Sequence, residues 1–115
     1  MPTTFTKIVL SGSTDGKQIA IASTASPGTT IHTAHATSLD EVWLYAVNTN
    51  ATASKLTVQF GSTTSPNDEI EVTVPGESGY LLAVPGLILT GSLVVKAFGG
   101  TTNHLNCHGF VNRIT

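Results

Sequence analysis

Apolar and polar residues alternate along most of this chain, with a period of two residues rather than the longer period of an α-helix. In residues 55–60, Leu56, Val58 and Phe60 fall on one face and polar side chains on the other. Residues 69–74 repeat the pattern. Such alternation predicts half-buried strands with one face toward solvent. Further strands are expected at residues 5–10, 17–22, 29–34, 41–49, 79–84, 92–98 and 104–112.

Two segments, residues 42–47 and residues 93–98, are apolar on both faces. This pattern predicts strands that lie centrally in their sheets and are covered on both sides. The cover has two possible sources, loops of the same chain or another subunit. We favour another subunit.

Turn signals separate the predicted strands. Pro-Gly pairs at residues 27–28, 75–76 and 85–86 predict type II turns, in which Pro fixes the first central residue and Gly supplies a positive φ at the second. No segment is long enough to predict a helix, although residues 37–40 could form one turn. This arrangement predicts an all-β fold: a single antiparallel β-sandwich of jelly-roll or Greek-key type, with about eight strands. The 115 residues suit one domain, with an N-terminal arm at 1–4 and the sandwich at 5–115.

The composition is poor in charge. Charged residues make up 10% of the chain and the formal net charge is −2. Protein interfaces are depleted in Lys, Glu and Asp, so the composition suits a subunit packed among neighbours. An extracellular sandwich with a neutral Thr- and Ser-rich surface fits equally well. The basic residues are scattered, so nucleic acid is not expected as a partner. No segment reads as a membrane span or as a secretory signal, and no membrane association is expected.

The histidines do not predict a metal site. His32 and His35 would point to opposite faces of a strand, and His104 and His108 would share a face but stand too far apart to bind one zinc ion. Cys107, the only cysteine, is expected in the core rather than as a reactive thiol.

The sequence also offers no catalytic constellation. The acidic pairs at residues 40–41 and 68–69 precede predicted strands, where carboxylates bond turn amides. No serine stands in a Gly-x-Ser-x-Gly motif, and Gly99-Gly100 opens no helix that could hold a phosphate. We therefore expect no enzyme activity, no catalytic residues, no metal and no cofactor.

Trp43 and Tyr45 share one face of a predicted strand. If exposed, they would stack on a sugar ring or anchor an interface; if buried, they would be core. We favour the core, because the strand around them is so apolar. The short apolar run Leu87, Ile88 and Leu89 is open to both interpretations, core or contact surface.

The order of segments 27–34, 41–48 and 109–115 resembles small structural proteins of tailed bacteriophage particles. The resemblance implies a capsid decoration (cement) protein, a β-sandwich that binds the major capsid protein outside the head shell, often as a trimer, and reinforces it against DNA pressure. It implies a location on the outer surface of the virion head after synthesis in the host cytoplasm. No catalytic residues are carried over.

Under this hypothesis residues 1–4 lie over a neighbour or extend a sheet edge, or else fray as a chain terminus. The alternative is a fibre, spike or tail-associated module that binds host surface carbohydrate through Trp43 and Tyr45 or the strands that carry histidine. A metal-dependent or hydrolytic enzyme is a third hypothesis. Glycan binding predicts an exposed aromatic platform, whereas decoration predicts an apolar oligomer contact and no pocket. The candidate interface residues are Met1, Pro2, Thr3, Thr4, Phe5, Trp43, Tyr45, Leu87, Ile88 and Leu89.

Overall fold

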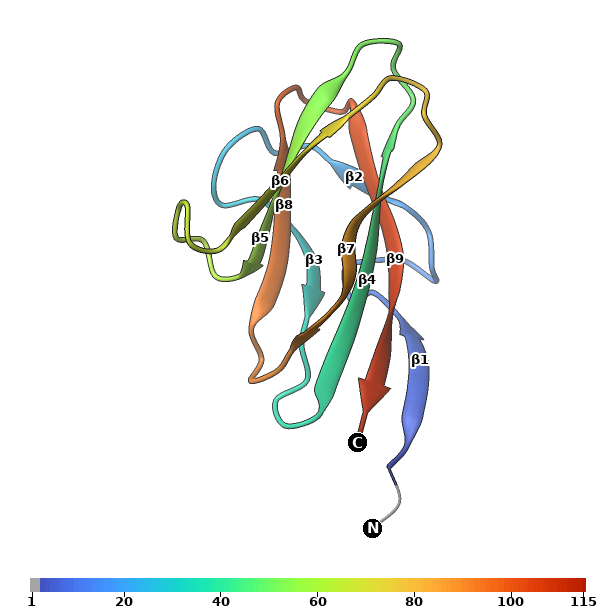
Figure 1. The fold of residues 1–115 in the computed structure, drawn as a ribbon, viewed down its shortest axis with the longest axis vertical. Coiled ribbons are helices and arrows are strands. Elements are labelled where there is room, and N and C mark those ends of the chain that lie inside the picture. Colours follow the sequence, from blue (N-terminus) through green and yellow to red (C-terminus); the bar gives the residue numbers. More distant parts are fainter. Residues whose placement is uncertain (1–2) are drawn as a thin grey trace.

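The computed structural model describes residues 3–115, so the candidate interface residues Met1 and Pro2 lie outside the described residues. Residues 3–115 form nine strands and no helix, which confirms the all-β prediction (Figure 1). Within this part of the chain no helix is long and apolar enough to cross a membrane. The strands are β1 (Phe5–Val9), β2 (Ile19–Ile21), β3 (Thr29–Thr33), β4 (Leu39–Asn48), β5 (Ser54–Gly61), β6 (Glu69–Val74), β7 (Tyr80–Leu89), β8 (Val94–Gly99) and β9 (Leu105–Ile114).

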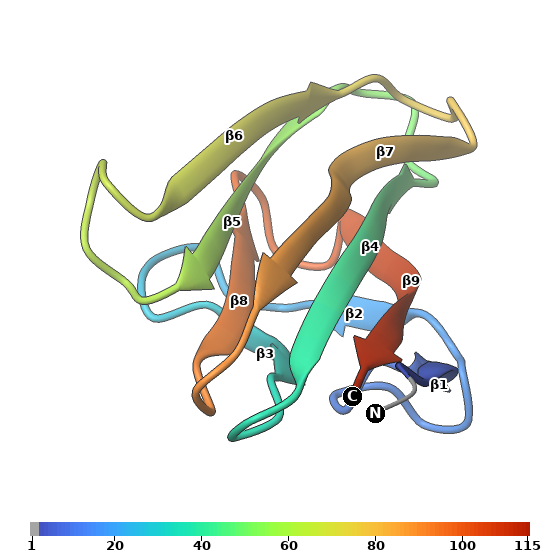
Figure 2. The ribbon, with the colours of Figure 1, turned by 60° about the horizontal axis from the view of Figure 1, so that its bottom comes forward.

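The strands form two antiparallel sheets that face each other as the layers of a sandwich (Figure 2). One sheet has the order β1-β9-β4-β7, and the other has the order β3-β8-β5-β6. β1 and β2 both pair with β9, at opposite ends of it, and together act as one interrupted edge strand. The chain is thus a long hairpin, with β1 and β2 against β9, β3 against β8, β4 against β7 and β5 against β6, wrapped into two layers. That is the jelly-roll arrangement, one of the two sandwich types that the sequence predicted.

The core lies between the two layers and takes every second residue of the strands. Val42 and Leu44 of β4 and Val58 of β5 are fully buried in it. Cys107 of β9 belongs to the same cluster, and burial raises the pKa of its thiol to about 12. The predicted core role of Cys107 is therefore confirmed.

The Pro-Gly pairs do not form the predicted type II turns. Gly28 and Gly76 lack a positive φ, and Gly86, whose φ is 75°, lies inside β7. Val42 pairs with Leu87 and Trp43 with Pro85, so Gly86 is the extra residue of a β-bulge. A Cβ at Gly86 would stand 2.7 Å from the Trp43 ring. Gly86 thus provides both the backbone conformation and the space that this indole needs.

A loop of the same chain covers the outward side of the second sheet. Gln59 of β5 is fully buried there: its Oε1 accepts from the Gly28 amide at 2.9 Å, and its Nε2 donates to Ser26 Oγ at 2.9 Å. Because β8 lies between β3 and β5, the loop at residues 22–28 must cross β8 to reach Gln59. For the apolar segment 93–98, a loop of the same chain therefore supplies cover, which was the source that the sequence analysis did not favour.

Candidate functional site

The most distinctive surface of the protein is the outward side of the β1-β9-β4-β7 sheet, which we term the outer face. Val42 and Leu44 of β4 and Val111 of β9 point into the core. Since successive side chains of a strand alternate between faces, Trp43, Tyr45 and the neighbours of Val111 project outward. The loop between β1 and β2 reaches this side at the Gly16 carbonyl, which accepts a hydrogen bond from His108.

Large apolar side chains gather on the outer face. Eight such side chains are well exposed in residues 3–115, and the strand registers place six of them on this side of the sheet. A soluble monomer rarely exposes so much apolar surface in one place, and such patches commonly mark interaction sites. The six are Phe5, Val9, Leu39, Tyr80, Leu82 and Ile88.

One end of the outer face is aliphatic apart from Phe5. Phe5 of β1, Ile114 of β9 and Leu39 of β4 lie in one row across the sheet, since Ile114 pairs with both of the others. Phe5 is 68% exposed and Ile88, on the adjacent edge strand β7, is 52% exposed. We call Phe5, Leu39, Ile88 and Ile114 the apolar end, whereas Val9 pairs with Phe110 farther along the sheet.

Trp43 lies in the middle of the outer face, half-buried, and is not part of the core cluster. Its ring stacks on Phe110 with centroids 6.2 Å apart, and its Nε1 donates to Glu41 Oε1 at 2.6 Å. Asn112 Nδ2 donates to the same oxygen, and the two hydrogen bonds, that from Trp43 first, lower the pKa of Glu41. The core position favoured for Trp43 and Tyr45 was therefore wrong, because both side chains point away from the core.

The other end of the outer face is hollowed into an aromatic pocket of about 220 Å³, lined by Tyr45, Tyr80, His108, Gly109 and Phe110. Tyr45 meets Tyr80 edge to face with centroids 5.9 Å apart, and the Tyr80 and His108 rings lie 5.7 Å apart. The decoration hypothesis predicts no pocket, so this feature does not agree with that part of the hypothesis. Sequence reasoning missed Tyr80, and it included His108 and Phe110 only through their strand, as one of those that carry histidine. The grouping with Tyr45 was not predicted, because these strands meet β4 only through the sheet pairing.

The candidate interface residues fall in different places. Thr3, Thr4 and Phe5 are exposed at the start of the described chain. Trp43 and Tyr45 share the outer face with Phe5 and Ile88, and Leu87 is exposed beside Val42 on the edge strand. Leu89 is 8% exposed and belongs to the core cluster, so it is not available for contact.

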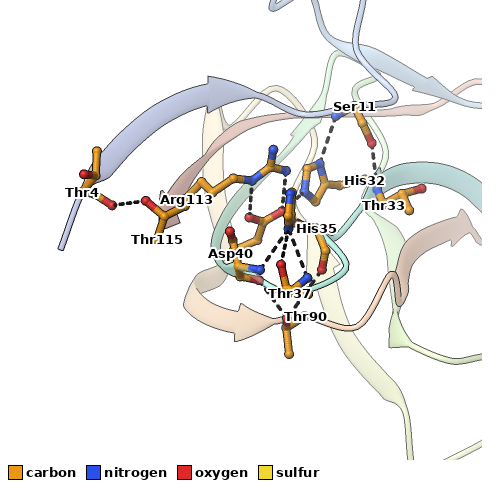
Figure 3. A network of polar contacts seen from close by, with 11 residues as sticks. Thr4, Ser11, His32, Thr33, His35, Thr37, Asp40, Thr90, Arg113 and Thr115 are labelled. Atoms are coloured by element: carbon orange, nitrogen blue, oxygen red, sulfur yellow. Dashed lines mark hydrogen bonds and ion pairs between the residues drawn. The ribbon is translucent and has the colours of Figure 1, made fainter. Parts of the chain in front are cut away.

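A buried polar network ties β3, β4 and β9 together at the end of the sandwich where β9 finishes (Figure 3). Asp40 is fully buried, with Arg113 Nε 2.8 Å from its Oδ1 and Arg113 Nη2 2.9 Å from its Oδ2. His32 Nδ1 accepts from the Ser11 amide at 3.0 Å, so its Nε2 carries the hydrogen and donates to Asp40 Oδ2 at 2.8 Å. The His35 amide also donates to Asp40.

The sequence predicts Asp40 before the strand, as a ligand for turn amides. In the structure the His35 backbone amide does donate a hydrogen bond to Asp40. Asp40 itself, however, lies inside β4 and its side chain faces inward. Its partners Arg113 and His32 could not be inferred from spacing, because one is distant in sequence and the other lies on a different sheet. The network is structural: His32 is as buried as Asp40, and each Asp40 oxygen already has a donor.

The Asp40 carboxylate makes the stability of the protein sensitive to acid. Burial raises the pKa of Asp40, but the hydrogen bonds from Arg113, His32 and the His35 amide, with the Arg113 charge, outweigh it and hold the pKa at about 2, below its ordinary value of 3.8. A carboxyl with a depressed folded-state pKa contributes stability that is complete above its unfolded pKa and is lost as the pH falls. We expect this group to contribute about 2 kcal/mol, lost as the pH falls from about 4 to about 2.

Urea denaturation at a series of acid pH values measures this effect. The Asp40→Asn protein should lose less stability over this range than the parent, because its side chain does not titrate. Glu71→Gln serves as the control: Glu71 is half-exposed and pairs only with the exposed Lys55, so the acid loss should remain. Equal pH dependence in the parent and Asp40→Asn proteins would contradict the assignment.

Within residues 3–115, no cluster of three or more His, Cys, Asp or Glu side chains is arranged to hold a metal ion. His108 is instead engaged with the Gly16 carbonyl and Tyr80, and His104 with Asn50. The polar and aromatic groups of the outer face therefore suit binding by stacking and hydrogen bonding.

Comparison with known proteins gives no relative: no family model matches the chain, and no curated protein or solved structure matches it significantly.

Proposed function

We propose that this protein is a structural subunit of a virus particle, a decoration protein that binds the major capsid protein on the outside of a tailed-phage head. The contact surface in this proposal is the apolar end of the outer face. The observation that carries it is the gathering of Phe5, Leu39 and Ile88 at one end of the outer face, exposed to solvent.

The chemistry of the apolar end supports a protein partner. Its side chains are mainly aliphatic and branched, and only Lys7 and Glu41 introduce charge in the adjoining row. The buried centre of a protein interface has this character, being rich in apolar side chains and poor in charge. The low charge of the whole chain fits the same role.

The fold agrees with the proposal without deciding it. Double-sheet jelly rolls occur in viral capsid proteins and also in lectins. Function must therefore be argued from the surface that the fold presents. The sequence resemblance to small phage structural proteins favours the capsid role, and the apolar end supplies the surface that such a role needs.

A trimer on the head surface belongs to the same proposal. Several copies that attach together to a symmetric shell gain avidity even when each contact is weak. Light scattering coupled to size-exclusion chromatography measures the mass of the assembly in solution. A trimer is the expected state, and a monomer at all concentrations would contradict this part of the proposal.

Polar substitution in the apolar end should weaken attachment to the shell. We expect Phe5→Ser and Ile88→Ser each to reduce binding at least about tenfold, because each removes a large exposed apolar side chain from the contact. The measurement is co-sedimentation of the purified protein with expanded heads of the virus that encodes it. Mass spectrometry of those particles tests whether the protein is present at all.

Leu93→Ser is the matched control. Leu93 is similarly exposed, but it lies in the loop between β7 and β8 and not on the outer face. Binding should be unchanged in this variant. Absence of the protein from purified particles, or equal loss of binding in Leu93→Ser and Phe5→Ser, would contradict the proposal.

A further inference from the structure

We propose that the aromatic pocket formed by Tyr45, Tyr80, His108, Gly109 and Phe110 binds a single uncharged pyranose ring of a glycan. This inference goes beyond attachment to a shell, since it concerns a different ligand at the other end of the outer face. Carbohydrate binding is the alternative that the sequence leaves open, through Trp43 and Tyr45 or the strands that carry histidine. In the structure Tyr45 lines the pocket together with Tyr80 and His108. Trp43 is not part of the lining but stacks on Phe110, which is.

The walls of the pocket suit the apolar side of a sugar ring. A pyranose presents a face of C–H groups and a rim of hydroxyls. Tyr45 and Tyr80 stand at 71° to each other, and His108 is tilted by 40° to Tyr80, so the rings form a concave site rather than a flat platform. Aromatic bodies with a polar tip are well matched to a ligand of this mixed character.

The hydrogen bonds of His108 determine whether the Tyr80 hydroxyl is available to a ligand as a donor or as an acceptor. His108 Nε2 lies 2.7 Å from the Gly16 carbonyl oxygen and must carry a hydrogen to donate to it. In the neutral ring Nδ1 is then an acceptor, and the Tyr80 hydroxyl, 3.3 Å away, donates to it. The Tyr80 oxygen is left with free lone pairs that can accept a hydrogen bond from a sugar hydroxyl.

The uncharged lining of the pocket favours a neutral ligand. None of the five lining residues is Lys, Arg, Asp or Glu. An aromatic cage can also bind a quaternary ammonium group, but Lys7 Nζ already lies 4.7 Å from the Phe110 ring centroid. A second cation beside that ring would be repelled. Anionic sugars find no arginine in the pocket to form a bidentate contact.

The pocket is also held in shape before any ligand arrives. Phe110 stacks on Trp43, and the Trp43 indole is held in place by its hydrogen bond to Glu41. His108 is fixed by the Gly16 carbonyl. Rigid walls reduce the entropy that a weakly binding sugar must overcome.

The pocket and the apolar end can be occupied at the same time. Leu39 and Tyr45 are six positions apart on β4, which corresponds to about 20 Å along a strand. The polar row of Lys7, Asn112 and Glu41 lies between them. The two sites are therefore separate parts of the outer face.

The test is an NMR titration of the isotopically labelled protein with methyl α-glucopyranoside, methyl β-galactopyranoside and N-acetylglucosamine, each used alone. We expect at least one to shift the Tyr45, Tyr80 and His108 resonances saturably, with a dissociation constant of about 1 mM, as suits a single small ring. Tyr80→Phe keeps the ring and removes only the hydroxyl, and it should weaken binding about fivefold. Tyr45→Ala should abolish the shifts.

Phe5→Ala is the matched control, an exposed aromatic on the same face outside the pocket. It should leave sugar binding unchanged, and Tyr45→Ala should leave co-sedimentation with heads unchanged, so the two proposals fail separately. Three results would overturn this one: no shift with any neutral pyranoside, equal shifts in the parent and Tyr45→Ala proteins, or stronger binding of choline or N-acetylneuraminic acid. The dispersed spectrum of each variant verifies that it is folded.

Discussion

Replacing Asp40 with alanine is expected to lower the free energy of unfolding by about 4 kcal/mol, a large part of the stability of a domain of this size. The change leaves the partly buried Arg113 guanidinium without its carboxylate and the buried His32 without its acceptor. It also frees the His35 amide. The effect is large because the buried His32 loses its acceptor and the guanidinium of Arg113, which is only 27% exposed, loses its counter-charge.

Chemical denaturation measures this loss, and the exposed ion pair of Lys55 with Glu71 provides the comparison. Both of those side chains are more than half exposed, so Glu71→Ala should change stability by less than about 1 kcal/mol. The double variant Asp40→Ala with Arg113→Met should recover part of the stability, because no unpaired charge then remains. A loss in Asp40→Ala no larger than that in Glu71→Ala would contradict a structural role for the network.

Gly109→Ala is the second substitution with a large expected effect, a loss of about 3 kcal/mol. Gly109 pairs with Leu44 in the centre of the sheet, and a Cβ there would overlap the Trp43 carbonyl oxygen. The neighbour that would have to move is backbone of the adjacent strand, which cannot rotate aside as a long side chain can. The pairing of β4 with β9 would have to open locally, and the base of the aromatic pocket would shift with it.

Gly100→Ala is the matched control for this prediction. Gly100 has no positive φ, and a Cβ added there would lie 3.7 Å from its nearest neighbouring atom, an ordinary contact distance. Its stability should change by less than about 0.5 kcal/mol. Thermal unfolding followed by circular dichroism compares the two variants, and similar melting temperatures would refute the proposed clash at Gly109.

The predicted strands agree closely with the observed ones because alternation is a local property. Leu56, Val58 and Phe60 alternate with polar residues whatever sheet they join, and the pattern alone places them in a strand with one buried face. The core position of Cys107 follows on the same basis. The jelly-roll class follows from the number and spacing of such segments.

The residues that the sequence assigned wrongly are those whose environment depends on the neighbouring strand. Pro85-Gly86 has the composition of a turn, but β4 continues past it, and pairing on both sides of Gly86 turns the dipeptide into a bulge. Trp43 lies in an apolar strand, yet its position in the alternation points its side chain outward. There it stacks on Phe110 and donates a hydrogen bond to Glu41. Leu89 belongs to an exposed-looking run, but its position beside Asp40 turns it inward.

The sequence by itself determined the strands, the face of most side chains, the buried thiol and the low charge of the surface. These follow from the two-residue period of an extended chain and from composition, both of which act along the chain. Only the tertiary structure decided that Asp40 meets Arg113 and His32, that Tyr45 meets Tyr80 and His108, and that the exposed apolar side chains share one face. Those groupings arise from pairing between strands that are far apart in the sequence. The spacing of residues along the chain does not show which of these strands will pair.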